Sequence, residues 1–109
     1  MPKKGAIILV PFPFTDLSDA KVRPALVVFT SRTGEDMIVV FISSKKGPHI
    51  GVFDIIVSPT KQNGLKMQSI IRGAKIATLE KKIAIGELGM LEKVAMKQVT
   101  STLRKVFGL

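Results

Sequence analysis

A succession of short apolar runs, rich in β-branched residues and each closed by turn residues, most constrains the fold of this chain. The runs cover residues 6–10, 25–30, 37–43, 52–57 and 69–76, and residues 83–88 form a sixth candidate. Runs of this length and composition predict strands. They follow one another without crossover helices between them, so we expect a mostly antiparallel sheet.

The end of the chain changes to the period of a helix. Its apolar positions fall three or four residues apart: Leu91, Val94, Ala95, Val99, Leu103 and Val106. Glu92 falls in the first turn and Arg104 and Lys105 fall in the last, as the helix dipole favours, and Gly108 supplies a stop. A chain of 109 residues suits one domain and is short for two. We therefore expect residues 1–109 to form a single, small, partly closed barrel capped by the helix.

The charge of the chain is strongly positive and uneven. The net charge is +9, and residues 60–109 carry ten Lys or Arg against three Asp or Glu. A cationic surface attracts polyanions and raises the rate of encounter with them. Nucleic acid or an acidic protein segment is therefore the expected partner. Solvated lysines that keep a small protein in solution explain the charge alone equally well.

Composition excludes several kinds of site. The sequence has no Cys and a single His, His49, so a disulfide, a thiolate zinc site and a His-based metal site are all excluded. The few carboxylates form no cluster suited to a divalent metal, and we expect neither metal nor cofactor. No apolar run reaches the roughly 18 residues of a membrane span. The start of the chain has no signal-peptide cleavage site, which favours a cytoplasmic protein.

The segment between the first two predicted strands, residues 11–24, is the most unusual in the sequence. It is long for a hairpin connection, which commonly has about two to five residues. Pro24 biases Arg23 toward extended backbone, and an arginine at the mouth of a barrel offers a planar fork of donors to a phosphate. Asp16 is near enough in sequence to orient Arg23 or to accept a proton. An exposed arginine before a strand, with Asp16 making a local turn, fits the same residues.

Hydroxyl and basic residues follow in two later strands. Ser43 and Ser44 end the third strand, directly before Lys45. Hydroxyls there can bond a phosphate and the lysine adds positive field, although a plain polar turn fits too. Arg72 and Lys75 lie three residues apart in the fifth strand and point to opposite faces of a regular strand. At most one of them should face a given cavity, unless a bulge re-aims them.

These segments resemble the PemK/MazF-type toxins of type II toxin–antitoxin modules. The most specific match is ILVPFPFTDLS at residues 8–18 followed by KVRPALVV at residues 21–28. Shorter matches are FISS at 41–44, NGLK at 63–66, SIIR at 69–72, KIATL at 75–79 and IGEL at 85–88. Together with the terminal helix they extend the resemblance over essentially the whole chain.

The resemblance implies a mainly β, small SH3-like barrel with a C-terminal helix, usually a homodimer. It implies cleavage of single-stranded RNA, often mRNA, at specific sequences and without metal, and an antitoxin with an acidic segment as partner. The family's loop arginine falls on Arg23, and its hydroxyl residue, usually threonine, falls on Ser43. Some members have a second basic residue in a later stretch that reads ATLE here, at residues 77–80. Arg72 or Lys75 is then the expected substitute.

The arginine and the hydroxyl suggest cleavage by attack of the ribose 2′-hydroxyl on the adjacent phosphate, leaving a 2′,3′-cyclic phosphate. Arg23 would stabilise the developing charge, and Ser43 would position the phosphate. Two other functions fit the same basic surface. One is a barrel that binds RNA or DNA without cutting it, and the other is a degenerate toxin that only binds its antitoxin.

Overall fold

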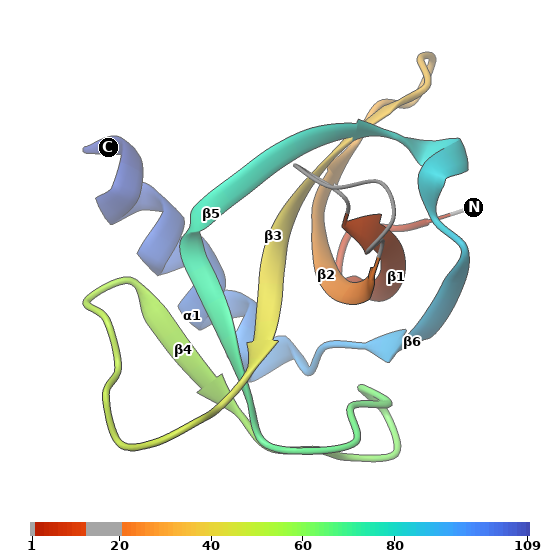
Figure 1. Cartoon of the computed structure of the whole chain (residues 1–109). Helices are drawn as coiled ribbons and strands as arrows, with labels where there is room; N and C mark the ends of the chain where they lie inside the picture. The colour runs from red at the N-terminus through yellow and green to blue at the C-terminus, as the bar shows by residue number, and fades with distance from the viewer. Residues whose placement is uncertain (1, 13–20) are drawn as a thin grey trace.

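The computed structural model describes residues 2–12 and 21–109, and within them six strands form one antiparallel sheet. In chain order the elements are β1 (Ala6–Phe12), β2 (Lys21–Thr30), β3 (Asp36–Ser44), β4 (Asp54–Val57), β5 (Ser69–Glu80), the 3-10 helix η2 (Lys81–Ile83), β6 (Gly86–Met90) and α1 (Lys93–Phe107). The strand order across the sheet is β4-β5-β3-β2-β1-β6. The sheet curls into a half-barrel (Figure 1), which confirms the predicted mainly β fold with a C-terminal helix.

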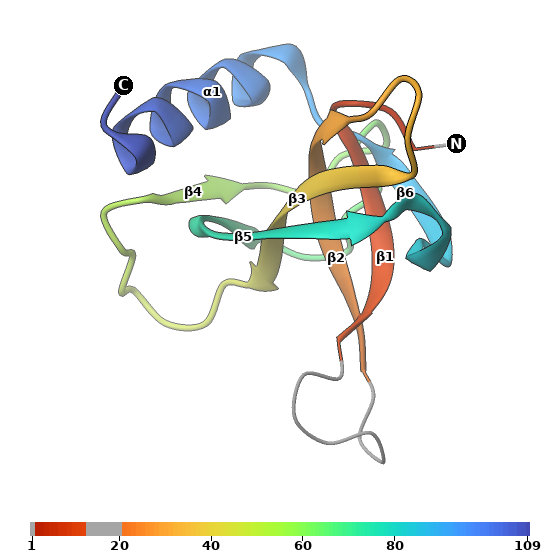
Figure 2. The same ribbon diagram turned by 90° about the horizontal axis from the view of Figure 1, so that it is seen from above.

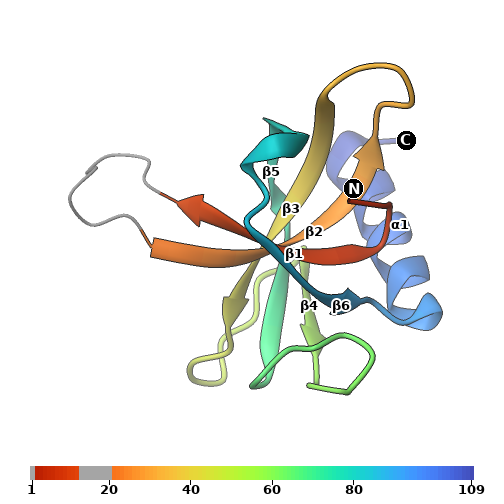
Figure 3. The ribbon, with the colours of Figure 1, turned by 90° about the vertical axis from the view of Figure 1, so that its right-hand side faces the viewer.

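Side chains alternate along the central strands and divide the core between the two faces of the sheet. One cluster lies under α1 and contains Ile7, Leu26, Val40 and Val99. The other contains the strand neighbours Ile8, Ala25, Val27 and Val39. Figures 2 and 3 show α1 along one side of the sheet. Burial on both faces explains why these runs are continuously apolar rather than alternating with polar residues.

The predicted limits of the segment before the second strand are wrong. β1 continues to Phe12 and β2 already begins at Lys21, so Arg23 and Pro24 lie in a strand and pair with Val10 and Leu9. β2 pairs with β3 only from Ala25 onward. Pro24 is tolerated because this part of β2 is an edge, where the missing N–H breaks no ladder.

Smaller differences concern the later elements. β4 begins at Asp54, two residues later than predicted, and β5 runs on to Glu80. The sixth strand lies at 86–90 because residues 81–83 form η2. Leu91 is buried before α1 begins, and Glu92 is the N-cap residue with extended backbone, not part of the first turn. Within the described ranges, no helix is long and apolar enough to cross a membrane.

Asn63 ties the connection between β4 and β5 to the start of α1. Its side chain is completely buried. The Nδ2 group donates to the carbonyl oxygen of Ser58 and to Oε1 of Glu92, at 3.0 and 3.2 Å. Oδ1 accepts from the backbone N–H groups of Thr60 and Leu65, both at 3.0 Å. The Thr60 hydroxyl donates to Oε2 of Glu92, so one buried amide links three segments.

Two glycines let this connection approach β6 closely. Gly64 has a φ of +70°, and a Cβ there would lie 2.0 Å from the carbonyl oxygen of Leu88. A Cβ on Gly89 would lie 2.1 Å from the carbonyl oxygen of Gln62. The N–H of Met90 donates to that same Gln62 oxygen at 2.8 Å. Side chains at either position would push the connection away from the sheet.

The network predicts that part of the stability depends on pH through Glu92. The Thr60 hydrogen bond lowers the pKa of Glu92 from its ordinary value of 4.5, against the opposing effect of burial. A lowered folded-state pKa gives stability that is present above about pH 4.5 and lost as pH falls through the folded value. Because solvent screens this partly exposed carboxylate, Glu92→Gln should cost no more than about 1 kcal/mol of unfolding free energy at neutral pH, and its deficit should shrink in acid. Urea unfolding across this pH range checks this, and parallel stability curves would contradict it.

Candidate functional site

Arg23 and Ser43 lie where β2 and β3 diverge, and both line a groove of about 500 Å³. The groove is bordered by residues from β1, β2, β3, β5 and β6, and from the connections after β3 and before β5. They are Leu9, Lys21, Val22, Arg23, Pro24, Ile42, Ser43, Ser44, Lys46, Leu65, Lys66, Met67, Ser69 and Leu88. The set includes four cations and no carboxylate among the described lining residues. The groove thus combines apolar surface with positive charge.

A smaller side cavity of about 180 Å³ adjoins the groove. It is lined by Arg23, Phe41, Ile42, Ser43, Arg72 and Lys75. Arg23, Ile42 and Ser43 therefore border both spaces. The predicted arginine and hydroxyl lie at the boundary, and the side cavity adds two further cations.

An irregularity in β5 places Arg72 and Lys75 on the same cavity. Val40 pairs with Ile76, but Ile42 pairs with Ile71. One residue of β3, Phe41, thus faces the four residues 72–75 of β5. A regular strand would direct Arg72 and Lys75 to opposite faces, whereas this bulge brings both to the cavity that Ser43 lines. The bulge required for the two basic residues to share a cavity is therefore present.

Arg72 bridges Ser43 and a carboxylate on β4. Its Nε donates to Oγ of Ser43 at 3.0 Å, and its Nη1 lies 3.4 Å from Oδ2 of Asp54. The same Asp54 oxygen accepts from the N–H of Gly51 at 2.8 Å. Asp54 and Arg72 are direct partners in the β4–β5 ladder. This fixes the direction of the guanidinium, and the Ser43 hydroxyl keeps its own proton to donate.

Such an arrangement can hold a phosphodiester. Guanidinium groups donate to phosphoryl oxygens in a fixed planar geometry, and the hydroxyl of Ser43 can donate to one of the same oxygens. Within the described part of the chain, no three His, Asp or Glu side chains gather as a metal-binding group. Positive charge in this region comes from Arg and Lys side chains.

Comparison with known families supplies the identification. Residues 3–107 match the family described as PemK-like, MazF-like toxin of type II toxin–antitoxin system. The chain belongs to this toxin family. None of the curated proteins matches the sequence.

Solved structures of similar fold agree with membership of the toxin family. An endoribonuclease in complex with its cognate antitoxin from a mycobacterial species has a TM-score of 0.78 and 20% identity, over 100% of this chain and 97% of the other. A MazE–MazF structure from Deinococcus radiodurans has a TM-score of 0.78 and 18% identity, over 99% and 96%. The Mycobacterium tuberculosis toxin MazF-mt6 has a TM-score of 0.74 and 16% identity, over 95% and 97%. At these identities the likeness shows the shared fold.

The remaining predicted site residues of this toxin-family chain differ in whether they line the groove. Ser44, which ends β3, lines the groove. Lys45 donates from Nζ to the carbonyl oxygen of Gly47 and borders neither space, whereas Lys46 lines the groove. Asp16 lies outside the described residues. Among the described residues, Asp54 contacts the site arginine Arg72, from which it is 18 residues away in sequence and to which it is joined by strand pairing.

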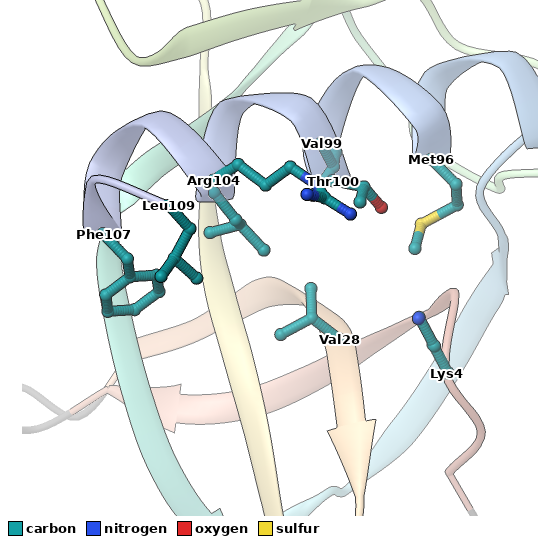
Figure 4. A pocket seen from close by; sticks show the side chains of 9 residues that line it. Lys4, Val28, Met96, Val99, Thr100, Arg104, Phe107 and Leu109 are labelled. Carbon is teal, nitrogen blue, oxygen red and sulfur yellow. The ribbon is translucent and has the colours of Figure 1, made fainter.

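A separate cavity of about 320 Å³ lies between α1 and β2. Figure 4 shows Val28 facing the helix, with Phe107 and Leu109 toward one end and Lys4 beside Met96 toward the other. It shares no lining residue with the groove or the side cavity. This second apolar space therefore belongs to the face of the sheet that α1 covers.

The Asp54–Arg72 pair should orient the arginine and contribute little to stability. The Arg72 side chain is 38% exposed and that of Asp54 is 10% exposed, so solvent weakens their attraction. We expect a coupling of about 0.5–1 kcal/mol from a double-mutant cycle with Asp54→Asn and Arg72→Gln. Urea unfolding of the four proteins measures it. A coupling well above about 2 kcal/mol would make the pair a structural one.

Proposed function

We propose that this toxin-family chain is an endoribonuclease that cuts single-stranded RNA in the groove, with Arg23 and Ser43 as catalytic residues. The observation that supports this most is that both border the groove and the side cavity, where Nε of Arg72 bonds the Ser43 hydroxyl at 3.0 Å. Two arginines and a hydroxyl therefore line one small cavity, which has room for a phosphate group. The endoribonuclease structures of the same fold are consistent with this activity.

The proposed reaction needs no metal. The ribose 2′-oxygen attacks the adjacent phosphorus and loses its proton to solvent, while the bond from phosphorus to the 5′-oxygen breaks and that oxygen takes up a proton. The products are a 2′,3′-cyclic phosphate and a 5′-hydroxyl. Negative charge grows on the phosphoryl oxygens during the attack, and preorganised donors aimed at it lower the barrier. Arg23 is the proposed donor, since a guanidinium offers several N–H groups in a fixed planar arrangement.

The neighbouring groups take supporting roles. Ser43 donates its proton to a phosphoryl oxygen, while Arg72 holds the Ser43 oxygen and adds positive charge. Lys75 faces the side cavity and Ser44 the groove, where each can bind a flanking phosphate. Lys45 follows Ser44 directly in the chain, and its charge adds to the positive field near the groove. Recognition of unpaired bases falls to the apolar part of the groove.

We further propose the partners typical of such toxins. The complexes of MazE with MazF and of the mycobacterial endoribonuclease with its antitoxin support an antitoxin partner. The cationic groove favours an acidic segment of that antitoxin. Val94, Phe107 and Leu109 leave apolar surface exposed on and after α1, which supports a homodimer, and light scattering checks it. With mRNA as substrate, the chain acts in the cytoplasm.

Arg23→Ala should lower the cleavage rate about 100- to 1,000-fold, because one preorganised transition-state donor is lost. Arg32→Ala is the matched control. It removes the same charge from the exposed connection between β2 and β3, at the other end of β2, and should leave the rate unchanged. Timed digestion of a mixed single-stranded RNA measures both. Cleavage by Arg23→Ala at the wild-type rate would refute the catalytic role.

Chelation of divalent metals tests whether cleavage proceeds without metal. Cleavage should continue in excess EDTA, and the products should carry a 2′,3′-cyclic phosphate, detected by mass spectrometry of the fragments. Loss of cleavage in EDTA that Mg²⁺ restores would contradict metal-free cleavage. Intact RNA that migrates more slowly in a gel would instead indicate a protein that binds without cutting.

A further inference from the structure

We infer that Asn63 and Glu92 are positioning residues for RNA binding, because their hydrogen bonds set the groove wall formed by residues 65–67. The inference rests on the proposed function of the groove. Neither residue borders the groove or the side cavity. They would therefore act through the wall, not on the RNA.

The side chains of the wall are suited to contacts with the phosphate and the base of one nucleotide. Leu65, Lys66 and Met67 all line the groove, and Met67 is 55% exposed. The ammonium group of Lys66 can neutralise a phosphate. The polarizable thioether of Met67 can lie against the face of a base. Adjacent residues with these two properties suit one nucleotide.

The wall is fixed at both ends. At its start, the N–H of Leu65 donates to Oδ1 of Asn63 at 3.0 Å, and the Leu65 side chain is buried. At its end, the Ser69 hydroxyl donates to the carbonyl oxygen of Met67 at 2.9 Å. Lys66 and Met67 lie between these two anchors. Their distance from Arg23 therefore depends on the position of Asn63.

Both polar atoms of the Asn63 side chain make hydrogen bonds in this network. Oδ1 bonds the wall through Leu65, while Nδ2 bonds Ser58 and Glu92 on the other side. Such a buried amide cannot move without leaving donors or acceptors unpaired. A change at Glu92 thus reaches the groove through one side chain. We expect it to alter how RNA binds and not how fast bound RNA is cut.

The experiment measures KM and kcat for one RNA oligonucleotide that the wild type cuts. Asn63→Asp keeps the acceptor for Leu65, loses both donors and sets two carboxylates against each other. KM should rise about tenfold, the equivalent of one hydrogen bond to a charged group, while kcat stays within about twofold because Arg23 and Ser43 are untouched. Adding Glu92→Gln restores an amide–carboxylate hydrogen bond in the reverse direction, and KM should return toward the wild-type value.

Matched variants separate this from a loss of folding. Thr60→Val keeps the volume and removes two bonds of the network, so it should raise KM in the same direction even if Asn63→Asp does not fold. Lys66→Ala should raise KM, whereas Lys61→Ala, in the same connection but outside the groove, should not. A network with only a structural role would lower the amount of folded enzyme and leave KM unchanged. That result would overturn the inference.

A different set of measurements applies if the protein binds RNA without cutting it. If the wild type leaves RNA intact, cleavage is refuted, and the Kd of the same oligonucleotide replaces KM. The tenfold weakening by Asn63→Asp and its reversal by Glu92→Gln are still expected from the wall. Equal Kd values for the wild type and Asn63→Asp would refute the positioning role.

Discussion

The hydrogen bonds of Asn63 are the interaction on which the shape of this molecule most depends. β4 and β6 are the two edge strands of the sheet, and no ladder joins them. The β4–β5 connection closes this gap by lying against β6 and the start of α1, and Asn63 holds it there. A buried amide with every bond satisfied specifies one arrangement, because each alternative leaves a polar group unpaired. Residues of the same connection form one wall of the groove, so the groove depends on this closure.

The chemistry of the site depends on two departures from regular sheet geometry. The first residues of β2 pair with β1 but not with β3. Arg23 therefore lies on a two-stranded ribbon beside the end of β3. The bulge at residues 72–75 then turns two basic residues of β5 toward Ser43. Bulges frequently re-aim side chains next to active sites. Residues far apart in sequence thereby meet in one small space, and an aspartate on β4 orients one of the arginines.

The fold could be predicted from the sequence more completely than the site. Apolar runs and the helical period of residues 91–106 predicted the order of strands and helix, because burial imposes those patterns directly. Arg23 and Ser43 could be singled out because each lies near an end of an apolar run. Asp54 could not, since its pairing with Arg72 depends on strand register. The predicted long loop was wrong because Pro24, usually a strand breaker, occupies an edge.

Internal attack requires the ribose 2′-hydroxyl beside the bond that breaks, so an RNA that lacks this one group tests the proposed reaction. The cleavage position is first mapped on an oligonucleotide, and a second oligonucleotide is made with a single 2′-deoxynucleotide immediately before that bond. We expect the protein to bind both oligonucleotides equally and to leave the modified bond uncut, since the nucleophile is missing. Cleavage of the modified bond at the original rate would rule out internal attack.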